Sequence, residues 1–260
     1  MKISFYKYQG TGNDFILIDN RQNIFDPKNI DLVQKLCNRK FGIGSDGLML
    51  LQNKVGYDFE MIFFNPDGSK SLCGNGSRCI VAFAKSLGII KDKARFITFD
   101  GEHEAVILQN GEVSLKMNDV KSVENGNGFY FLNTGSPHYC ALVKDIQHYD
   151  VFAEGKKIRN SDRFKKDGTN VNFLEKSEDS VFVRTYERGV ENETLSCGTG
   201  VTAAALVAAM AGISSAENYC NIKTSGGNLK VKFKKNQDNS FSDIRLEGPA
   251  AFVYKGEIEI

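Results

Sequence analysis

The hydrophobic pattern of the chain predicts many short strands and a few helices. Residues 27–42 have the amphipathic pattern of a helix, and small-residue helices follow Cys73 and Cys197, ending near Gly88 and Gly212. Runs rich in aromatic and β-branched residues, bounded by turn residues, are typical of strands. Such runs predict strands at residues 5–8, 15–19, 48–51, 59–64, 95–99, 104–108 and 113–117.

The order of these features repeats along the chain. Asn13 precedes Cys73 by 60 residues, and His138 precedes Cys197 by 59 residues. Each cysteine is followed by a helix and then by alternating strands around a glycine turn, "ITFDGEHEAVIL" in the first case and "IKTSGGNLKVKF" in the second. A duplicated α+β unit explains this order better than chance similarity does.

The polar stretch at residues 118–126 is the expected seam between the two copies. We therefore expect an N-terminal half at residues 1–118 and a C-terminal half at residues 119–249. A last strand near residues 250–260 is expected to return to the N-terminal half.

Composition and charge exclude several classes of protein. The 260 residues are 41% hydrophobic and 25% charged, with a formal net charge of +1. The chain therefore lacks the basic excess of proteins that bind nucleic acid or an anionic membrane surface. Its longest apolar run, residues 201–211, is shorter than the roughly 20 residues of a membrane span. Residues 1–15 lack the apolar segment of a secretory signal, so we expect a cytoplasmic protein.

Six cysteines raise the question of a disulfide framework or a metal site. No Cys-x-x-Cys spacing occurs, the three histidines do not cluster with cysteines, and a secreted disulfide framework needs an export signal. We therefore expect neither. Four of the cysteines lie in helical or apolar stretches and are expected to pack in the core: Cys37, Cys79, Cys140 and Cys220.

Cys73 and Cys197 differ from the other four because each precedes a glycine-rich helix start, "CGNG" and "CGTG". The first amides of a helix have no acceptor within the helix, and glycine lets a ligand approach them closely. These amides and the helix dipole favour a bound carboxylate, and they lower the pKa of a thiol from its usual value of about 8.5.

Two matching cysteines suit one reaction in particular. If a pseudo-twofold axis relates the halves, the cysteines face each other across a shared cleft. One thiolate can then remove a proton from one face of an α-carbon while the opposite thiol returns a proton to the other face. The pattern therefore predicts two-base inversion of an amino acid centre.

Two other motifs have competing interpretations. "GIGSDG" at residues 42–47 matches a dinucleotide-binding pattern, but it follows a helix and precedes a strand, which is the reverse of the required context. We expect no nucleotide there, although the loop can line a cleft. Glu187 and Arg188, ten and nine residues before Cys197, are either a solvated charged pair or part of a site.

Six segments, in this order, resemble the diaminopimelate epimerase family. They are "GTGNDF", "GIGSDG", "FFNPDGSKSLCGNGSRC", "GSPH", "NVNF" and "YERG…E…SCGTG", from near residue 10 to near residue 200. The resemblance implies an isomerase that interconverts LL- and meso-diaminopimelate for lysine and peptidoglycan precursor synthesis, without a cofactor. It also implies an α/β fold of two pseudo-symmetric halves, each a mixed sheet curled around a central helix, with the active site in the cleft between them. The expected partners are the small-molecule substrate and a second copy in a homodimer.

The same resemblance assigns roles residue by residue. Cys73 and Cys197 take the places of the catalytic acid–base pair, and His138 and Glu187 match residues that tune the thiols. The residues that match the substrate-binding set are Asn13, Asn65, Gly74, Asn75, Asn170, Glu187, Arg188, Gly198 and Thr199. The chain departs from the family at Gly47, where some members have Gln, and at Ser136, where some have Asn. The resemblance therefore carries no side-chain contact to Gly47, and it leaves open whether the shorter Ser136 hydroxyl group binds substrate.

Three other functions fit parts of the pattern. A proline or hydroxyproline racemase of the same architecture has no use for Asn65, Asn170 and Arg188, because its substrate has no distal amino acid group. A thiol redox switch explains the cysteine pair alone. A non-enzymatic binding module has no need of paired thiols.

Overall fold

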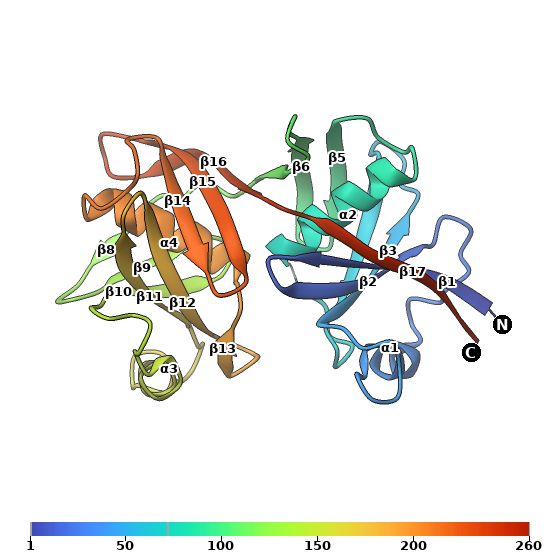
Figure 1. The fold of residues 1–260 in the computed structure, drawn as a ribbon, viewed down its shortest axis with the longest axis horizontal. Coiled ribbons are helices and arrows are strands. Elements are labelled where there is room, and N and C mark those ends of the chain that lie inside the picture. Colours follow the sequence, from blue (N-terminus) through green and yellow to red (C-terminus); the bar gives the residue numbers. More distant parts are fainter. Residues whose placement is uncertain (1, 72, 260) are drawn as a thin grey trace. The chain divides into compact units, whose positions relative to one another are not determined.

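The computed structural model describes residues 2–71 and 73–259 and divides into two compact units. Unit 1 comprises Met1–Leu115 and Gly248–Ile260, and unit 2 comprises Lys116–Glu247 (Figure 1). Each unit is a mixed sheet with two helices. The two units are described separately below.

The sheet of unit 1 begins at β17 and continues through β1 to β7 in sequence order. The β2–β3 and β4–β5 pairs are parallel, and the other pairs are antiparallel. The strand β17 pairs with β1 over almost its whole length; Ile260, at the end of the expected last strand, lies outside the described residues. The strands are β1 (Lys2–Gly10), β2 (Asn13–Asp19), β3 (Gly47–Gln52), β4 (Phe59–Phe64), β5 (Lys93–Thr98), β6 (Gly101–Ile107), β7 (Val113–Lys116) and β17 (Ala251–Glu259).

Unit 2 repeats this sequence of pairings. The β10–β11 and β12–β14 pairs are parallel, and antiparallel pairs lie between and beyond them. The added strand β13 pairs only with β12 among the described residues. The duplicated α+β unit expected from the sequence is therefore confirmed. The strands are β8 (Glu124–Asn125), β9 (Tyr130–Asn133), β10 (Pro137–Leu142), β11 (Asn170–Ser177), β12 (Ser180–Glu187), β13 (Asn192–Thr194), β14 (Tyr219–Thr224), β15 (Gly227–Lys235) and β16 (Phe241–Gly248).

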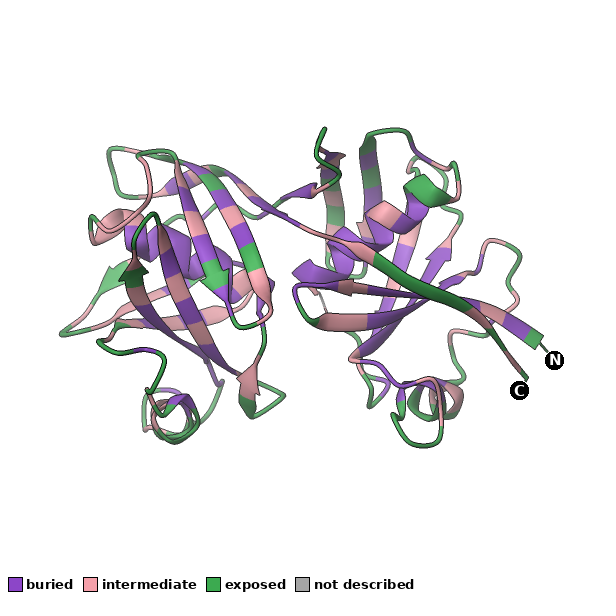
Figure 2. Cartoon of the chain, viewed as in Figure 1, coloured by how far each residue is buried: buried purple, intermediate pink, exposed green. Residues whose placement is uncertain are grey.

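One helix fills the inside of each curled sheet. The helix α2 (Gly74–Ser86) contacts strands from both ends of the unit 1 sheet, including β1, β3, β6 and β17. In unit 2, α4 (Gly198–Met210) contacts β9 to β12, β14 and β15. Almost every position of α4 is small or apolar, as a helix surrounded by sheet requires, and Figure 2 shows it buried along nearly its whole length.

A second helix covers the outer face of each sheet. In unit 1, α1 (Ile30–Cys37) packs Val33 and Leu36 against Ile16 and Ile18 of β2. Because alternate strand residues point to opposite faces, the intervening Phe15 and Leu17 are buried on the inner face. In unit 2, α3 (Val151–Arg159) packs on β11 and β12 in the same way.

The expected helix at residues 27–42 is shorter than predicted. It ends at Cys37 because Asn38 takes an extended conformation and its backbone N–H donates to the carbonyls of Gln34 and Lys35. Residues 38–46 then form a loop that leads into β3. The two helices after Cys73 and Cys197 begin and end within two residues of their predicted positions.

Candidate active site

Cys73 is the N-cap of α2, the central helix of unit 1. Its φ and ψ of −126° and 110° are those of extended chain, and its Sγ accepts a hydrogen bond from the backbone N–H of Gly76 at 3.4 Å. Sulfur is a weak acceptor when neutral and a stronger one as a thiolate. The capping position therefore favours partial negative charge at Cys73.

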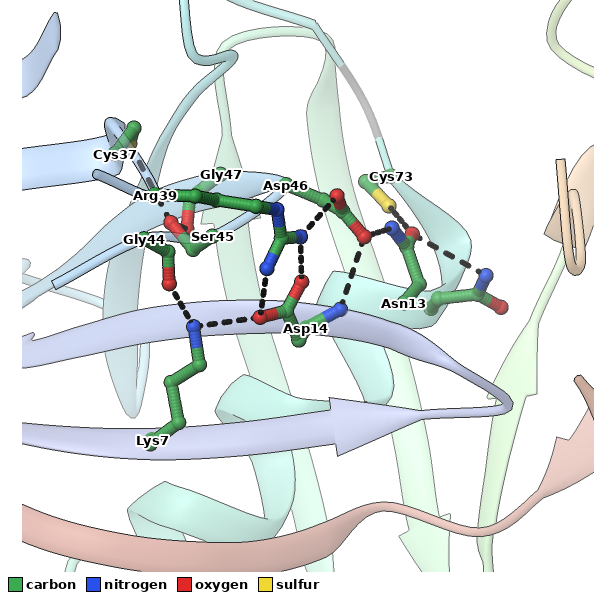
Figure 3. A network of polar contacts seen from close by, with 11 residues as sticks. Lys7, Asn13, Asp14, Cys37, Arg39, Gly44, Ser45, Asp46, Gly47 and Cys73 are labelled. Atoms are coloured by element: carbon green, nitrogen blue, oxygen red, sulfur yellow. Dashed lines mark hydrogen bonds and ion pairs between the residues drawn. The ribbon is translucent and has the colours of Figure 1, made fainter. Parts of the chain in front are cut away.

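Asn13 reaches Cys73 from a tight hairpin. Thr11 and Gly12 both have positive φ, 50° and 84°, which is the geometry of a two-residue turn between β1 and β2. Asn13 is the first residue of β2 after this turn. Its Oδ1 lies 3.6 Å from the Sγ of Cys73 and 3.4 Å from the Nδ2 of Asn75 (Figure 3).

The "GIGSDG" loop supports Asn13 from the other side. Asp46, the residue before β3, accepts a hydrogen bond from the Nδ2 of Asn13 at 2.6 Å (Figure 3). Arg39 donates to both Asp46 and Asp14, at 2.7 and 2.5 Å, and Lys7 forms an ion pair with Asp14 at 2.6 Å. Burial raises the pKa of Asp14, but hydrogen bonds from Arg39 and Lys7 outweigh it and hold that pKa at about 2. The loop is thus a charged support for the Cys73 region.

Arg78 lies one turn along α2 from Asn75 and is fully buried. Its guanidinium donates to the Oδ1 of Asn75 at 3.0 Å and to the Oγ1 of Thr11 at 3.3 Å. No carboxylate lies within ion-pair distance of Arg78 in the described residues. Burial therefore lowers the pKa of this guanidinium.

Asn65 belongs to a separate loop that follows β4. Its Nδ2 donates to the Oγ of Ser69 at 2.9 Å, and its Oδ1 accepts from the Oγ of Ser71 at 3.1 Å. Ser71 is two residues before Cys73, so the chain itself links Asn65 to the start of α2. A cavity of about 110 Å³ opens beside this loop, lined in part by Lys70 and Ser71.

Cys197 is the N-cap of α4 and has nearly the same backbone conformation as Cys73, with φ and ψ of −117° and 115°. Its Sγ lies 3.5 Å from the Oγ1 of Thr199. Thr199 is held by Thr134, whose Oγ1 donates to the Thr199 carbonyl at 2.9 Å, and by the Oγ of Ser136 at 3.2 Å. The Cys197 thiol therefore contacts the Thr199 hydroxyl group, whereas the Cys73 thiol contacts the Asn13 side-chain amide and the Gly76 backbone N–H.

His138 reaches Cys197 only through other side chains. Its Nε2 lies 3.3 Å from the Oγ of Ser136, which contacts Thr199, and its Nδ1 lies 3.1 Å from the Nδ2 of Asn172. Burial, with a smaller effect from Arg188, lowers the pKa of His138 to about 3. His138 is therefore a neutral imidazole that contacts Ser136 and not the Cys197 thiol itself.

Asn170 and the start of the Glu187–Arg188 turn are joined directly. The Oδ1 of Asn170 accepts from the backbone N–H of Arg188 at 2.9 Å, and its Nδ2 donates to the Oγ of Ser136 at 3.4 Å. The Arg188 side chain is exposed, donates to the carbonyl of Asp167 at 2.9 Å, and makes no ion pair with any described residue. Glu187 accepts a hydrogen bond from the Oγ1 of Thr194 at 2.8 Å. The pair is thus anchored at its backbone, and the exposed Arg188 guanidinium donates only to a backbone carbonyl among the described residues.

The remaining cysteines are buried and unpaired with one another. Burial raises the pKa of all four thiols, that of Cys79 to about 12, so they are poor nucleophiles. Within residues 2–71 and 73–259, no group of three or more His, Cys, Asp and Glu side chains is arranged to hold a metal ion. No helix in that part of the chain is long and apolar enough to cross a membrane.

Three side chains of these two sites were not expected from the sequence: Asp46, Arg78 and Asn172. Each contacts a residue that the sequence did predict: Asp46 contacts Asn13, Asn172 contacts His138, and Arg78 contacts Asn75 one helical turn away. Asn172 lies within the "NVNF" segment that carries part of the family resemblance, but the resemblance assigned no role to Asn172 itself.

Solved structures share the fold over the whole length of the chain. A phenazine biosynthesis protein of the PhzF family from Bacillus anthracis is 14% identical with a TM-score of 0.77, and each chain is covered completely. A hydroxyproline epimerase from Agrobacterium vitis is 16% identical with a TM-score of 0.70, over 99% of this chain and 92% of that one. The fold is therefore the two-unit fold found in these proteins.

Sequence comparison identifies the family within this fold. The sequence profile described as diaminopimelate epimerase matches residues 5–123 and 130–253. The diaminopimelate epimerase of Flavobacterium psychrophilum is 51% identical over 98% of this chain and 100% of its own length. That of Chlorobaculum tepidum is 41% identical over 96% and 99%. The chain belongs to the diaminopimelate epimerase family, as the motifs predicted, and is an isomerase.

Proposed function

We propose that the chain interconverts LL- and meso-diaminopimelate without a cofactor, with Cys73 and Cys197 as the two bases. The observation that carries the proposal is the matching position of the two thiols. Each caps the central helix of its unit in an extended conformation, whereas none of the other four cysteines is at a helix N-cap. The full-length similarity to diaminopimelate epimerases supplies the substrate.

The reaction requires one proton to leave and another to arrive on opposite faces of the α-carbon. The thiolate of one cysteine takes the α-proton and becomes a thiol, and the electron pair left on carbon spreads into the neighbouring carboxylate. The thiol of the other cysteine then donates its proton to the opposite face and becomes a thiolate. The roles of the two cysteines are therefore exchanged after each turnover.

The helix starts supply the electrostatic part of this reaction. The amides that follow each cysteine, at Gly74 and Asn75 and at Gly198 and Thr199, belong to first helical turns and have no acceptor within their helices. Donors of this kind stabilise charge that develops on the substrate carboxylate as the α-proton leaves. Because these donors are fixed before the reaction begins, they need no reorganisation during it.

The distal end of the substrate fits the groups around Arg188. A guanidinium that lacks a carboxylate partner in the described residues matches a second carboxylate in two parallel hydrogen bonds. Glu187 is next to it and suits the distal ammonium group. Asn13, Asn65 and Asn170 complete the proposed substrate-binding set.

His138 and Glu187 are the proposed tuning groups. His138 acts as a neutral residue that holds Ser136, and through it Thr199, near the Cys197 thiol. Two hydroxyl groups, those of Ser136 and Thr199, stand between the imidazole and the sulfur, so the proposed tuning by His138 is indirect.

A homodimer and a cytoplasmic location are part of the same proposal. The strand β17 leaves Phe252, Val253 and Tyr254 exposed by 54, 52 and 42%, which is an unusual run for a surface strand. Such a run suits a contact with a second copy of the chain. Sedimentation of the purified protein tests the dimer, and a Tyr254→Lys variant should shift it toward the monomer.

The function is tested by incubating the purified protein with LL-diaminopimelate, without added metal or cofactor, and resolving the stereoisomers. We expect meso product from the wild type and none from Cys73→Ala or Cys197→Ala, because inversion needs an acid and a base. The Cys37→Ala variant, which removes a core thiol, is the control and should remain active. Inversion by either of the two active-site variants would contradict the proposal, as would protection of neither thiol from alkylation by substrate.

A further inference from the structure

Asp46 has no part in the reaction described above, yet it makes the shortest contact to the Cys73 site. One carboxylate oxygen, Oδ2, accepts from the Nδ2 of Asn13 at 2.6 Å and from the backbone N–H of Asp14 at 3.2 Å. The other, Oδ1, accepts from the Nη2 of Arg39 at 2.7 Å. Figure 3 shows Asp46 between Arg39 and Asn13, with Asn13 between Asp46 and Cys73.

These contacts leave the Asn13 amide one orientation. An ionised carboxylate has only acceptors, so the Asn13 atom that meets it must be the NH2 group. The Oδ1 of Asn13 therefore points the other way, to the Sγ of Cys73 at 3.6 Å. A carbonyl oxygen in that position accepts a thiol proton and does not stabilise a thiolate.

The neighbouring amide is fixed independently from its other end. A guanidinium has only donors, so the Asn75 atom that Arg78 meets at 3.0 Å must be Oδ1. The NH2 group of Asn75 then faces the Oδ1 of Asn13 at 3.4 Å. The acceptor at Asp46 and the donor at Arg78 therefore fix the two amides consistently, with the Oδ1 of Asn13 facing the NH2 group of Asn75.

We propose that Asp46 is a positioning residue of the epimerase reaction proposed above, which orients the Asn13 amide so that Cys73 is held as a thiol in the free enzyme. The charged and titratable groups around Cys73 are Arg78 and Cys79 on α2, and Asp46 with Arg39 behind Asn13. Arg78 and the backbone N–H of Gly76 favour the thiolate, and the Asn13 oxygen favours the thiol. Reversing the amide should therefore shift the balance to the thiolate.

The Asp46→Asn variant reverses the amide without changing its shape. If Arg39 keeps its acceptor, the new NH2 group takes the place of Oδ2, faces Asn13 and leaves the backbone N–H of Asp14 without this acceptor. Asn13 then turns its oxygen to this group and its NH2 to Cys73. The Asp14→Asn variant is the matched control, since it alters the same charged cluster at Lys7 and Arg39 but has no side-chain contact with Asn13.

Two measurements follow from the reversed amide. Iodoacetamide labelling of Cys73, followed by peptide mass spectrometry between about pH 6 and pH 9, should become about tenfold faster near neutral pH in Asp46→Asn and not in Asp14→Asn. The value of kcat for diaminopimelate should fall about tenfold or more, with a smaller change in KM, although the thiol is more reactive. Replacing a residue that only stabilised the fold would accelerate the labelling of a buried thiol such as Cys79 together with that of Cys73, whereas a reversed Asn13 amide should accelerate the labelling of Cys73 alone.

A double-mutant cycle tests whether Asp46 acts through Asn13. In an Asn13→Ser background, Asp46→Asn should change neither the labelling rate nor kcat further. Melting temperatures of all variants check the fold, and Asp46→Ser replaces Asp46→Asn if that protein does not fold. Unchanged Cys73 labelling in a folded Asp46 variant, or full additivity in the cycle, would overturn the inference. Labelling needs no turnover, so it gives an answer even if the protein does not epimerise diaminopimelate.

Discussion

The Nδ2 of Asn172 lies 3.1 Å from the Nδ1 of His138. The Oδ1 of Asn172 accepts from the Oγ1 of Thr185 at 2.9 Å, which leaves only the NH2 group of Asn172 for the imidazole. Nδ1 of His138 is therefore an acceptor, and the single ring proton is on Nε2, next to the Oγ of Ser136. The geometry and the low pKa of His138, about 3, agree on a neutral imidazole.

His138 should therefore not titrate in the working range of the enzyme. Burial, and then the charge of Arg188, lower its pKa to about 3, so its ring resonances should stay constant between about pH 8 and pH 4. A ¹H–¹³C NMR titration checks this, with the His138→Gln variant identifying the signal. A midpoint for His138 near pH 6 would contradict the lowered pKa.

The lowered pKa of His138 also predicts how the stability of the fold changes with pH. Between about pH 6.5 and pH 3 the unfolded chain binds a proton at His138 that the folded chain does not, so the free energy of unfolding falls as the pH falls. In His138→Gln, whose side-chain oxygen can still accept from Asn172, this decline should be weaker. Urea unfolding at about pH 7 and about pH 5 measures the difference, and equal slopes for both proteins would contradict it.

Gly76 and Gly200 occupy equivalent positions in the two central helices but should differ in how well they tolerate replacement by alanine. A Cβ on Gly200 would lie 2.5 Å from the Oδ1 of Asn172, whereas a Cβ on Gly76 would lie 3.3 Å from the flexible end of Met49. We expect Gly200→Ala to destabilise the protein by about 1–3 kcal/mol and to lower kcat, because Asn172 must move away from His138. Gly76→Ala should cost much less. Thermal unfolding and initial rates compare the two, and equal losses would mean that Asn172 can adjust.

The fold was largely predictable because its signals are local. A cysteine before glycine at each helix start and a glycine after each helix end were enough to locate α2 and α4. The outer helix α3 was not singled out, because it buries little more than Val151 and Gly155 and its remaining residues are mostly polar. The division at residues 118 and 249 stays a prediction about domains.

The sequence alone could indicate only those site residues whose type and position in a motif already suggest a chemical role. Cys73 and Cys197 were found because a thiol before a helix has a physical consequence in the sequence alone. Asp46 and Asn172 contact residues 33 and 34 positions away, and those contacts exist only after parallel strands pair. Neither residue type nor spacing could have indicated which neighbour each would hold.

Arg188→Ala should lower kcat/KM by about tenfold to a hundredfold, because a distal carboxylate loses its two-pronged partner. Arg188→Lys keeps the charge but not the planar donor pair, so it should recover only part of the loss. The backbone N–H that donates to Asn170 is retained in both variants, so the melting temperatures should stay close to that of the wild type. Near-normal kinetics in Arg188→Ala would place this guanidinium outside the substrate site.

The most direct test of two bases follows the hydrogen itself. The thiol that donates exchanges with solvent before substrate binds, while the abstracted proton stays on the opposite cysteine until product leaves. In deuterated water, product formed early from either stereoisomer should therefore carry deuterium at the inverted centre, and unreacted substrate should carry little. Mass spectrometry of the separated isomers at low conversion measures both.

A single base that moved between the two faces would give the opposite distribution, since it would return the substrate's own hydrogen to the product. The Cys73→Ser and Cys197→Ser variants sharpen the comparison, because each retains one base. Each should exchange hydrogen only at the stereoisomer whose α-proton faces the remaining cysteine, and neither should invert the centre. Because exchange in the two variants should fall on opposite stereoisomers, the pair of experiments also assigns each cysteine to its face of the substrate.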